Sequence, residues 1–298
     1  MNTPRVSAAI GVVGGSGLYG LSGLEGAREI EIETPFGSPS DAFRVGTLSG
    51  VRVAFLSRHG RHHEKLPGEV NYRANLWAFK KLGVERLISA SAVGSLRQEI
   101  EPRHVVAVDQ FIDRTRLRPT TFFGSGLVAH VSFADPVCPE LRGHLARAVR
   151  DQGGTIHDGG TYVCVEGPAF STRAESELFR RWDADVIGMT NYQEARLARE
   201  AEICYATLAL VTDFDCWHQE EEDVTVAGVI ENLHANAELA AKAIGQVVVE
   251  LGGQAATCHC SQALKDAILT PFEHVPRETL ERLEPILARY RAARRLLE

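Results

Sequence analysis

The sequence predicts an α/β fold in which a central mixed or parallel β-sheet is flanked by helices. Short apolar runs alternate with amphipathic stretches over most of the 298 residues. The run at 203–211 is almost wholly apolar, as expected of a buried parallel strand. Residues 71–82 place Leu76, Phe79 and Leu82 at helical spacing before Gly83, which is typical of a helix end.

The other apolar patterns predict the remaining elements in chain order. Strands are expected over residues 8–13, 29–33, 51–56, 84–92, 104–112, 161–165 and 185–189. Helices are expected over residues 139–152, 172–182, 193–201 and 224–251. Many of the strands end in glycine, hydroxyl or charged residues, so one edge of the sheet collects the polar chemistry.

We expect a single domain over residues 1–251, followed by a C-terminal extension over residues 252–298. Residues 252–262 are glycine- and polar-rich and predict a linker. The rest of the extension contains a proline break and a charged helix from about Arg277. We expect this helical tail to be an appendage that packs on a neighbouring subunit.

Composition excludes several classes of protein. Hydrophobic residues make up 44% and charged residues 24%, values typical of a soluble globular chain. A net charge of -7 and only short arginine patches (114–118 and 289–295) argue against nucleic-acid binding. No apolar stretch is long enough to span a membrane, and the N-terminus does not resemble a signal peptide. The expected location is the cytoplasm.

The histidines and cysteines do not predict a metal site. His59, His62 and His63 lack clustered acidic partners. The adjacent Cys258-His259-Cys260 cannot surround one tetrahedral zinc ion without outside ligands, and no second cysteine pair follows. A structural role is therefore expected there, with a strained vicinal redox pair as the alternative.

The most informative motif is Val211-Thr212-Asp213-Phe214-Asp215-Cys216-Trp217. Asp213 and Asp215 follow the buried strand at its carboxyl end, where open α/β sheets bind ligands. A carboxyl group that is hard to ionise there could protonate a ring nitrogen of a purine leaving group. The alternative is that one Asp caps the next helix and the other is solvated.

The glycine turn after the first strand predicts an anion site. Gly15-Ser16-Gly17-Leu18-Tyr19-Gly20 matches a dinucleotide-binding pattern, but the glycine-rich residues after it do not predict the required helix. A backbone nest for one phosphate, with the hydroxyl of Ser16 as an extra donor, fits better than a nicotinamide cofactor. A mobile turn is the alternative.

Arg58 and His59 follow the strand at 51–56 and suit a phosphate. Arginine presents a fork of donors to phosphate oxygens, and histidine can donate or relay a proton. A surface salt bridge is the alternative for this pair. Ser91 ends the next strand among small residues, which suits close approach of the backbone to a ligand.

Two further strand ends supply groups suited to a sugar and a base. Phe170 has a flat face for stacking, although Ser171 or Thr172 beside it could simply cap a helix. Met189 offers an apolar face for a sugar ring, and Thr190 offers a hydroxyl group. One cleft that binds an anion, a sugar and a base would explain all of these strand ends.

Nine motifs in this order resemble those of the 5′-methylthioadenosine phosphorylases, in the trimeric branch of the purine nucleoside phosphorylases. They are GVVGGSGLYG, ETPFGSPS, SRHGRHH, VNYRANLWA, AVGSLRQEI, DQFIDRT, EGPAFSTRAES, GMT and TDFDCW. The resemblance covers about residues 9–251 and implies a nucleoside phosphorylase-like fold. It also implies a homotrimer that uses inorganic phosphate as a co-substrate, with no metal or organic cofactor. The implied reaction converts a 5′-modified adenine nucleoside and phosphate to adenine and a sugar 1-phosphate.

The resemblance also implies a role for each site residue. Phosphate contacts fall to Ser16, Arg58, His59, Ser91 and Thr190. The base is assigned to Phe170, Ser171, Asp213 and Asp215, with Asp213 as the acid at purine N7. The ribose and 5′ pocket are assigned to Met189, Val226 and Val229, together with His130 and Leu269 of a neighbouring subunit.

The sequence departs from the family pattern beside the sugar. Gly188 replaces the usual Asn and Gln193 the usual Pro, while Asn191 and Tyr192 are also unusual. A specialised 5′ group, as in 5′-deoxy-5′-fluoroadenosine, is therefore an alternative to the 5′-methylthio group, as is adenosine or another purine nucleoside. The rival functions are a nucleosidase that uses water, a non-catalytic nucleotide-binding domain and a dinucleotide-dependent oxidoreductase.

Overall fold

The structure, a computed structural model, describes residues 8–15, 18, 23–218 and 226–295. For residues 226–230 and 292–295 it describes the backbone alone. Ser16 therefore lies outside the described residues, as do the side chains of Val226 and Val229.

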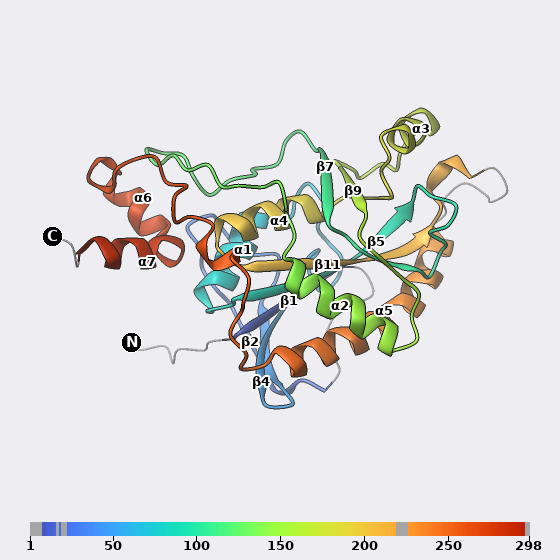
Figure 1. The fold of residues 1–298 in the computed structure, drawn as a ribbon, viewed down its shortest axis with the longest axis horizontal. Coiled ribbons are helices and arrows are strands. Elements are labelled where there is room, and N and C mark those ends of the chain that lie inside the picture. Colours follow the sequence, from blue (N-terminus) through green and yellow to red (C-terminus); the bar gives the residue numbers. More distant parts are fainter. Residues whose placement is uncertain (1–7, 16–17, 19–22, 219–225, 296–298) are drawn as a thin grey trace.

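One mixed β-sheet contains every strand of the described chain (Figure 1). Its strands are β1 (Ile10–Gly14), β2 (Glu25–Ile30), β3 (Phe43–Leu48), β4 (Val51–Ser57), β5 (Arg86–Ser95), β6 (Val105–Ala107), β7 (Gln110–Arg114), β8 (Ile156–Asp158), β9 (Thr161–Val165), β10 (Val186–Gly188) and β11 (Cys204–Asp213). The order along the main path is β2-β3-β4-β1-β5-β10-β9-β7, and β11, β6 and β8 branch from β5.

Strand β5 is the hub of this sheet. It runs parallel to β1 and β11 and antiparallel to β10. The carboxyl ends of β1, β4, β5 and β11 consequently share one edge, because β4 is also parallel to β1. Residues 204–212 of β11 are all buried, so the predicted buried parallel strand is confirmed.

Helices cover both faces of the sheet (Figure 1). They are α1 (Tyr72–Lys81), α2 (Pro139–Asp151), α3 (Arg173–Arg181), α4 (Asn191–Glu200), α5 (Val226–Leu251), α6 (Arg277–Arg282) and α7 (Glu284–Arg295). Helices α2 and α5 pack on each other and on β11, while α1 and α4 pack together on the opposite face. Apolar side chains from both sets bury the sheet in two large clusters.

The C-terminal extension packs on its own chain. Leu283, Ile286 and Leu287 are buried in the same apolar cluster as Leu76 of α1. The indole N–H of Trp77 donates a hydrogen bond to the backbone carbonyl of Arg282 at 2.9 Å. The predicted division at residue 251 and the contact with a neighbouring subunit stay predictions.

Several sequence predictions of elements need correction. The strand expected at 104–112 is split into β6 and β7, because the chain turns at Asp109, whose carboxylate accepts a hydrogen bond from Gly160 N–H. The strand expected at 29–33 lies earlier, as β2, and is mostly exposed. Strands β3 and β8 were not predicted, and the charged C-terminal helix is two helices, α6 and α7.

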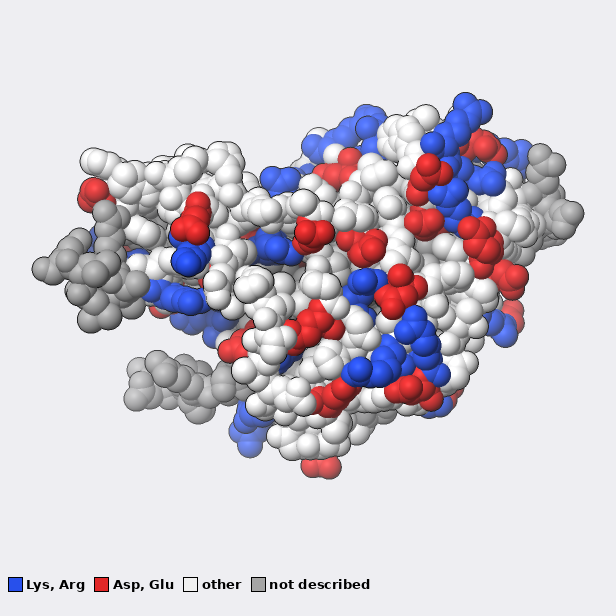
Figure 2. Space-filling model, viewed as in Figure 1, with Lys and Arg blue, Asp and Glu red and all other residues white. Residues whose placement is uncertain are grey.

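The surface carries both charge signs. Figure 2 shows Lys and Arg side chains interspersed with Asp and Glu, without one large field of either sign on this face. Within the described part of the chain, no helix is long and apolar enough to cross a membrane.

Candidate active site

A cavity of about 320 Å³ opens at the carboxyl edge of the sheet. It is lined by nine of the residues predicted for the site: Arg58, His59, Ser91, Phe170, Ser171, Met189, Thr190, Asp213 and Asp215. They lie at or just after the ends of β4, β10 and β11 or in the loop after β9, except Ser91, which lies inside β5 because that strand continues to Ser95. The structure therefore brings these nine residues together in one cleft, and their roles stay predictions.

The two carboxyl groups at the end of β11 have different surroundings. Asp213 accepts hydrogen bonds from the hydroxyl of Thr212 at 2.7 Å and from the backbone N–H of Asp215 at 2.9 Å. Thr212 is itself a residue of β11, and its hydroxyl oxygen lies 3.2 Å from the carbonyl oxygen of Val93 on β5. The position of Asp213 is therefore fixed by the sheet itself.

Asp215 is buried rather than solvated, which excludes the alternative of a solvated carboxylate. The residue is 8% exposed, and among the described residues its Oδ2 has no hydrogen-bond partner. Its backbone adopts a left-handed φ of 52°, a conformation that Asp tolerates better than most side chains. Burial raises the pKa of this carboxyl group, so its neutral, proton-donating form is favoured.

Arg58 lies at the opposite end of the cavity in a buried ion pair. It is 1% exposed, and its Nε donates to Oε1 of Glu194 at 2.5 Å. Its Nη2 donates to Ser89 Oγ at 2.7 Å, and its Nη1 to the carbonyl of Ala90 at 3.1 Å. The alternative of a surface salt bridge is wrong, because Arg58 is buried, is paired with Glu194 and lines the cavity.

His59 is uncharged at neutral pH. Burial, followed by the charge of Arg58, lowers its pKa to about 4. Its Nδ1 lies 2.8 Å from the carbonyl of Lys65, which can only accept, so Nδ1 carries the proton and Nε2 is an acceptor. In the free protein His59 is therefore suited to accept a hydrogen bond from a phosphate hydroxyl group.

The N-terminus of helix α4 completes the anion end of the cavity. Thr190 is the N-cap residue and lines the cavity, and its side chain makes no capping hydrogen bond. The free backbone N–H groups of a helix start attract anions. Ser91 donates its hydroxyl to Asn191 Oδ1 in the first turn, which ties β5 to the start of this helix.

The aromatic ring of Phe170 and the thioether of Met189 line the cavity together with its carboxyl and anion ends. Phe170 lines the cavity and is 52% exposed, so its ring is accessible for stacking. Met189 lies against Gly167, where an added Cβ would come within 2.5 Å of the Met sulfur. The chain therefore needs glycine at this point in order to seat Met189.

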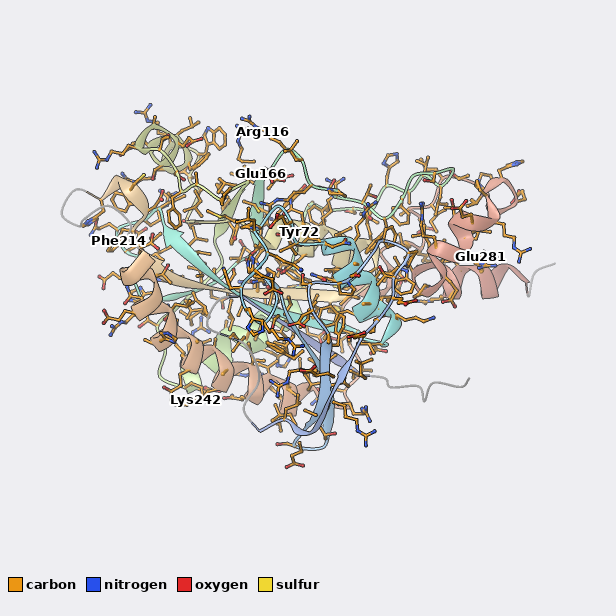
Figure 3. The ribbon with its side chains drawn as sticks, turned by 180° about the vertical axis from the view of Figure 1, so that it is seen from behind. Tyr72, Arg116, Glu166, Phe214, Lys242 and Glu281 are labelled. Atoms are coloured by element: carbon orange, nitrogen blue, oxygen red, sulfur yellow. The ribbon has the colours of Figure 1, made fainter. Side chains whose placement is uncertain are left out.

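Arg118 joins the segments on which Phe170 and Met189 lie. Its Nε donates to Glu166 Oε1 at 2.8 Å, and its Nη1 donates to the carbonyl of Met189. It also reaches the Tyr72 hydroxyl at 3.3 Å, and Figure 3 labels both Glu166 and Tyr72. Neither Arg118 nor Glu194 was predicted from the sequence, because neither belongs to a strand-end motif.

The unusual residues near the sugar have mainly structural roles. Gly188 is required because an added Cβ would lie 2.0 Å from the Tyr162 hydroxyl. Asn191 donates to Ser89 and Tyr205, and Gln193 donates to Thr115. Of these four departures from the family pattern, only Gly188 lines the cavity.

The two residues predicted to serve a neighbouring subunit lie away from this cavity and close to each other. Residues 128–130 pair with residues 267–269 through backbone hydrogen bonds, including His130 N–H to the carbonyl of Ala267 at 2.8 Å. His130 is exposed, and Leu269 is 62% exposed. The pair forms one exposed ridge, and its contact with another subunit stays a prediction.

Comparison with known proteins identifies the class to which this site belongs. A family model described as the phosphorylase superfamily matches residues 9–251, and the chain belongs to that superfamily. Within it, the chain belongs to the S-methyl-5′-thioadenosine phosphorylases. The relative from Gloeobacter violaceus is 59% identical over 292 residues, covering 96% of this chain and 97% of the relative. The relative from Geobacter sulfurreducens is 55% identical, covering 94% and 98%.

Solved structures agree with this assignment. A methylthioadenosine phosphorylase from an antarctic soil metagenomic library superimposes with a TM-score of 0.90 at 50% identity, covering 95% of this chain and 99% of that chain. The Schistosoma mansoni methylthioadenosine phosphorylase in complex with adenine has a TM-score of 0.81 at 36% identity, covering 87% and 96%. The predicted fold and family are confirmed.

Proposed function

We propose that this protein catalyses phosphorolysis of 5′-methylthioadenosine to adenine and 5-methylthioribose 1-phosphate. The observation that carries the proposal is a single cavity with opposite chemistry at its two ends. Asp213 and Asp215 lie at one end, and Arg58, His59 and the start of α4 lie at the other. The products would enter purine and methionine salvage.

The two ends suit the two halves of this reaction. As the bond from sugar C1′ to purine N9 breaks, positive charge develops on the sugar ring, as in other glycosyl transfers. A phosphate held by Arg58, Ser91 and Thr190 stabilises that charge and then attacks C1′. Since His59 is uncharged, its Nε2 accepts a hydrogen bond from a phosphate hydroxyl group and holds the nucleophile in one orientation.

The purine leaves more readily when its N7 is protonated or accepts a hydrogen bond. We assign this role to Asp213, which is fixed by Thr212 at the end of β11. Asp215 is its alternative, because burial raises the pKa of Asp215. A carboxylate also accepts a hydrogen bond from the adenine 6-amino group, which favours adenine over 6-oxopurines.

The remaining parts of the proposal extend beyond one chain. Val226 and Val229 are assigned to the 5′ group, together with the exposed His130 and Leu269 of a neighbouring subunit. A homotrimer would bring that ridge to the adjacent cavity. We further propose that the reaction needs no metal or organic cofactor and takes place in the cytoplasm.

A substrate panel tests the proposed specificity. 5′-Methylthioadenosine, adenosine and 5′-deoxy-5′-fluoroadenosine differ only in the 5′ group, and 5′-methylthioinosine differs only in the base. We expect the highest kcat/KM for 5′-methylthioadenosine and a large loss for the inosine analogue. Preference for the fluoro compound would support the specialised alternative, and equal use of the inosine analogue would contradict the assigned role of the carboxyl groups.

A further inference from the structure

Four cysteines that are far apart in the sequence meet at the opposite end of β11 from the active site. Cys138 precedes helix α2, Cys204 is the first residue of β11, and Cys258 and Cys260 follow helix α5. Their four sulfur atoms all lie within 4.8 Å of one another. Cys138, Cys204 and Cys260 are buried, and Cys258 is partly buried.

The spacing of these sulfur atoms is that of a tetrahedral metal site. A Zn–S bond of about 2.3 Å places the sulfur atoms of a tetrahedral site about 3.8 Å apart. The Cys204 and Cys258 sulfur atoms are 3.2 Å apart, and the largest separation is under 4.8 Å. A small contraction or expansion of the cluster would therefore accommodate one ion.

We propose that Cys138, Cys204, Cys258 and Cys260 bind one zinc ion. Cys258 and Cys260 alone could not surround a metal ion, and Cys138 and Cys204 supply the two further ligands. His259, between that pair, is exposed and is not part of the cluster. Binding releases the four thiol protons and leaves a zinc tetrathiolate with a net charge of −2.

Two features of the surroundings favour that negative charge. Cys138 is the N-cap residue of α2, where the helix dipole stabilises a thiolate. Arg86 on β5 is the register partner of Cys204 on the neighbouring parallel strand, so the two side chains lie on the same face of the sheet. Arg86 is 3% exposed, and among the described residues its Nη2 has no hydrogen-bond partner.

The position of the cluster indicates a structural role. Cys204 and Asp213 are the two ends of a ten-residue strand, which at about 3.3 Å per residue separates them by roughly 30 Å. At that distance the zinc ion would not take part in the active site. It would instead link the chain that follows α5 to α2 and β11. Glu140 in the first turn of α2 already accepts a hydrogen bond from Thr257 N–H at 3.0 Å on the same segment.

Metal analysis of the full chain tests this proposal. The protein is purified without a metal-affinity column, reduced, incubated with zinc and freed of unbound metal, and its zinc content is measured by mass spectrometry. We expect one zinc ion per chain and a lower melting temperature after removal by a chelator. Replacement of zinc by cobalt is expected to give the intense sulfur-to-cobalt charge-transfer absorption of a tetrathiolate.

Matched variants assign the ligands. The double variant Cys258→Ser/Cys260→Ser should lose the metal, whereas His259→Ala and Cys164→Ala should keep it. If the double variant does not fold, the cobalt spectrum of the unmodified chain still decides the ligand type. Absence of bound metal after reduction and zinc addition, retention of metal by the folded double variant, or disulfides within the cluster of the freshly purified protein would each overturn the proposal.

Discussion

The Arg58–Glu194 pair offers a direct test of how the anion end of the cavity is built. Glu194 is 2% exposed, and its carboxylate accepts hydrogen bonds from Arg58, Ser89, Asn191 and Tyr205. Glu194→Gln keeps the shape of the side chain but removes its charge. It also replaces one acceptor oxygen with an amide donor that faces other donors.

The expected cost follows from the burial of the pair. Breaking a buried ion pair on one side leaves an uncompensated charge and costs about 3–5 kcal/mol. For a chain of this length, each kcal/mol lowers the melting temperature by about 2 °C. We therefore expect Glu194→Gln to melt about 6–10 °C below the unmodified protein.

Differential scanning calorimetry of the two proteins measures this difference. The matched control is Asp183→Asn, which removes the charge from the ion pair with Arg97 at a side chain that is 91% exposed. Exposed pairs contribute at most about 1 kcal/mol, so its melting temperature should change by less than about 2 °C. Equal, small shifts in both variants would refute the view that Glu194 holds Arg58 in place.

Three further predictions concern the acid, the histidine and the glycine. Asp213→Asn should lower kcat/KM for 5′-methylthioadenosine by about 10²–10⁴-fold, and unchanged turnover would remove Asp213 from the role of acid. His59 has its pKa lowered to about 4, so the unfolded chain binds more protons than the folded one between pH 6.5 and 4. As the pH is lowered from 6.5 to 4, the free energy of unfolding should therefore fall by at most about 3 kcal/mol, measured by urea unfolding. The fall should be smaller in His59→Asn. Gly188→Ala should cost about 1–3 kcal/mol because its Cβ would meet the Tyr162 hydroxyl, whereas Gly143→Ala, in open space on α2, should not destabilise the fold.

The rule that ligands bind at the carboxyl ends of the strands in open α/β sheets accounts for most of the site that the sequence predicts. Asp213 and Asp215 were found because a long apolar run ends directly before them, and β11 is that run. The same rule places Arg58 after β4, since β4, β1, β5 and β11 are parallel and bring their carboxyl ends to one edge. Met189 reaches this edge in another way, because β10 is antiparallel to β5 and pairs with Gly94 and Ser95 at its carboxyl end. Fold class and cavity lining were therefore accessible from local pattern.

Other features depend on contacts that no local pattern encodes. Glu194 lies 136 residues from Arg58 in the sequence, and its place in an amphipathic helix is compatible with a solvated surface. The adjacent pair Cys258 and Cys260 meets Cys138 and Cys204 only after the chain has folded. Because Asp is common in turns, the sequence gives no sign that Asp215 is buried, and its burial becomes visible only in the structure.

Phosphate dependence of adenine release is the measurement that tests the central claim most directly. 5′-Methylthioadenosine is incubated with the enzyme in the presence and absence of inorganic phosphate, and adenine and the sugar product are quantified. We predict adenine release only with phosphate, together with an equal amount of 5-methylthioribose 1-phosphate. Equal release without phosphate, yielding the free sugar, would identify a nucleosidase and contradict the phosphate-binding roles of Arg58, His59 and Thr190.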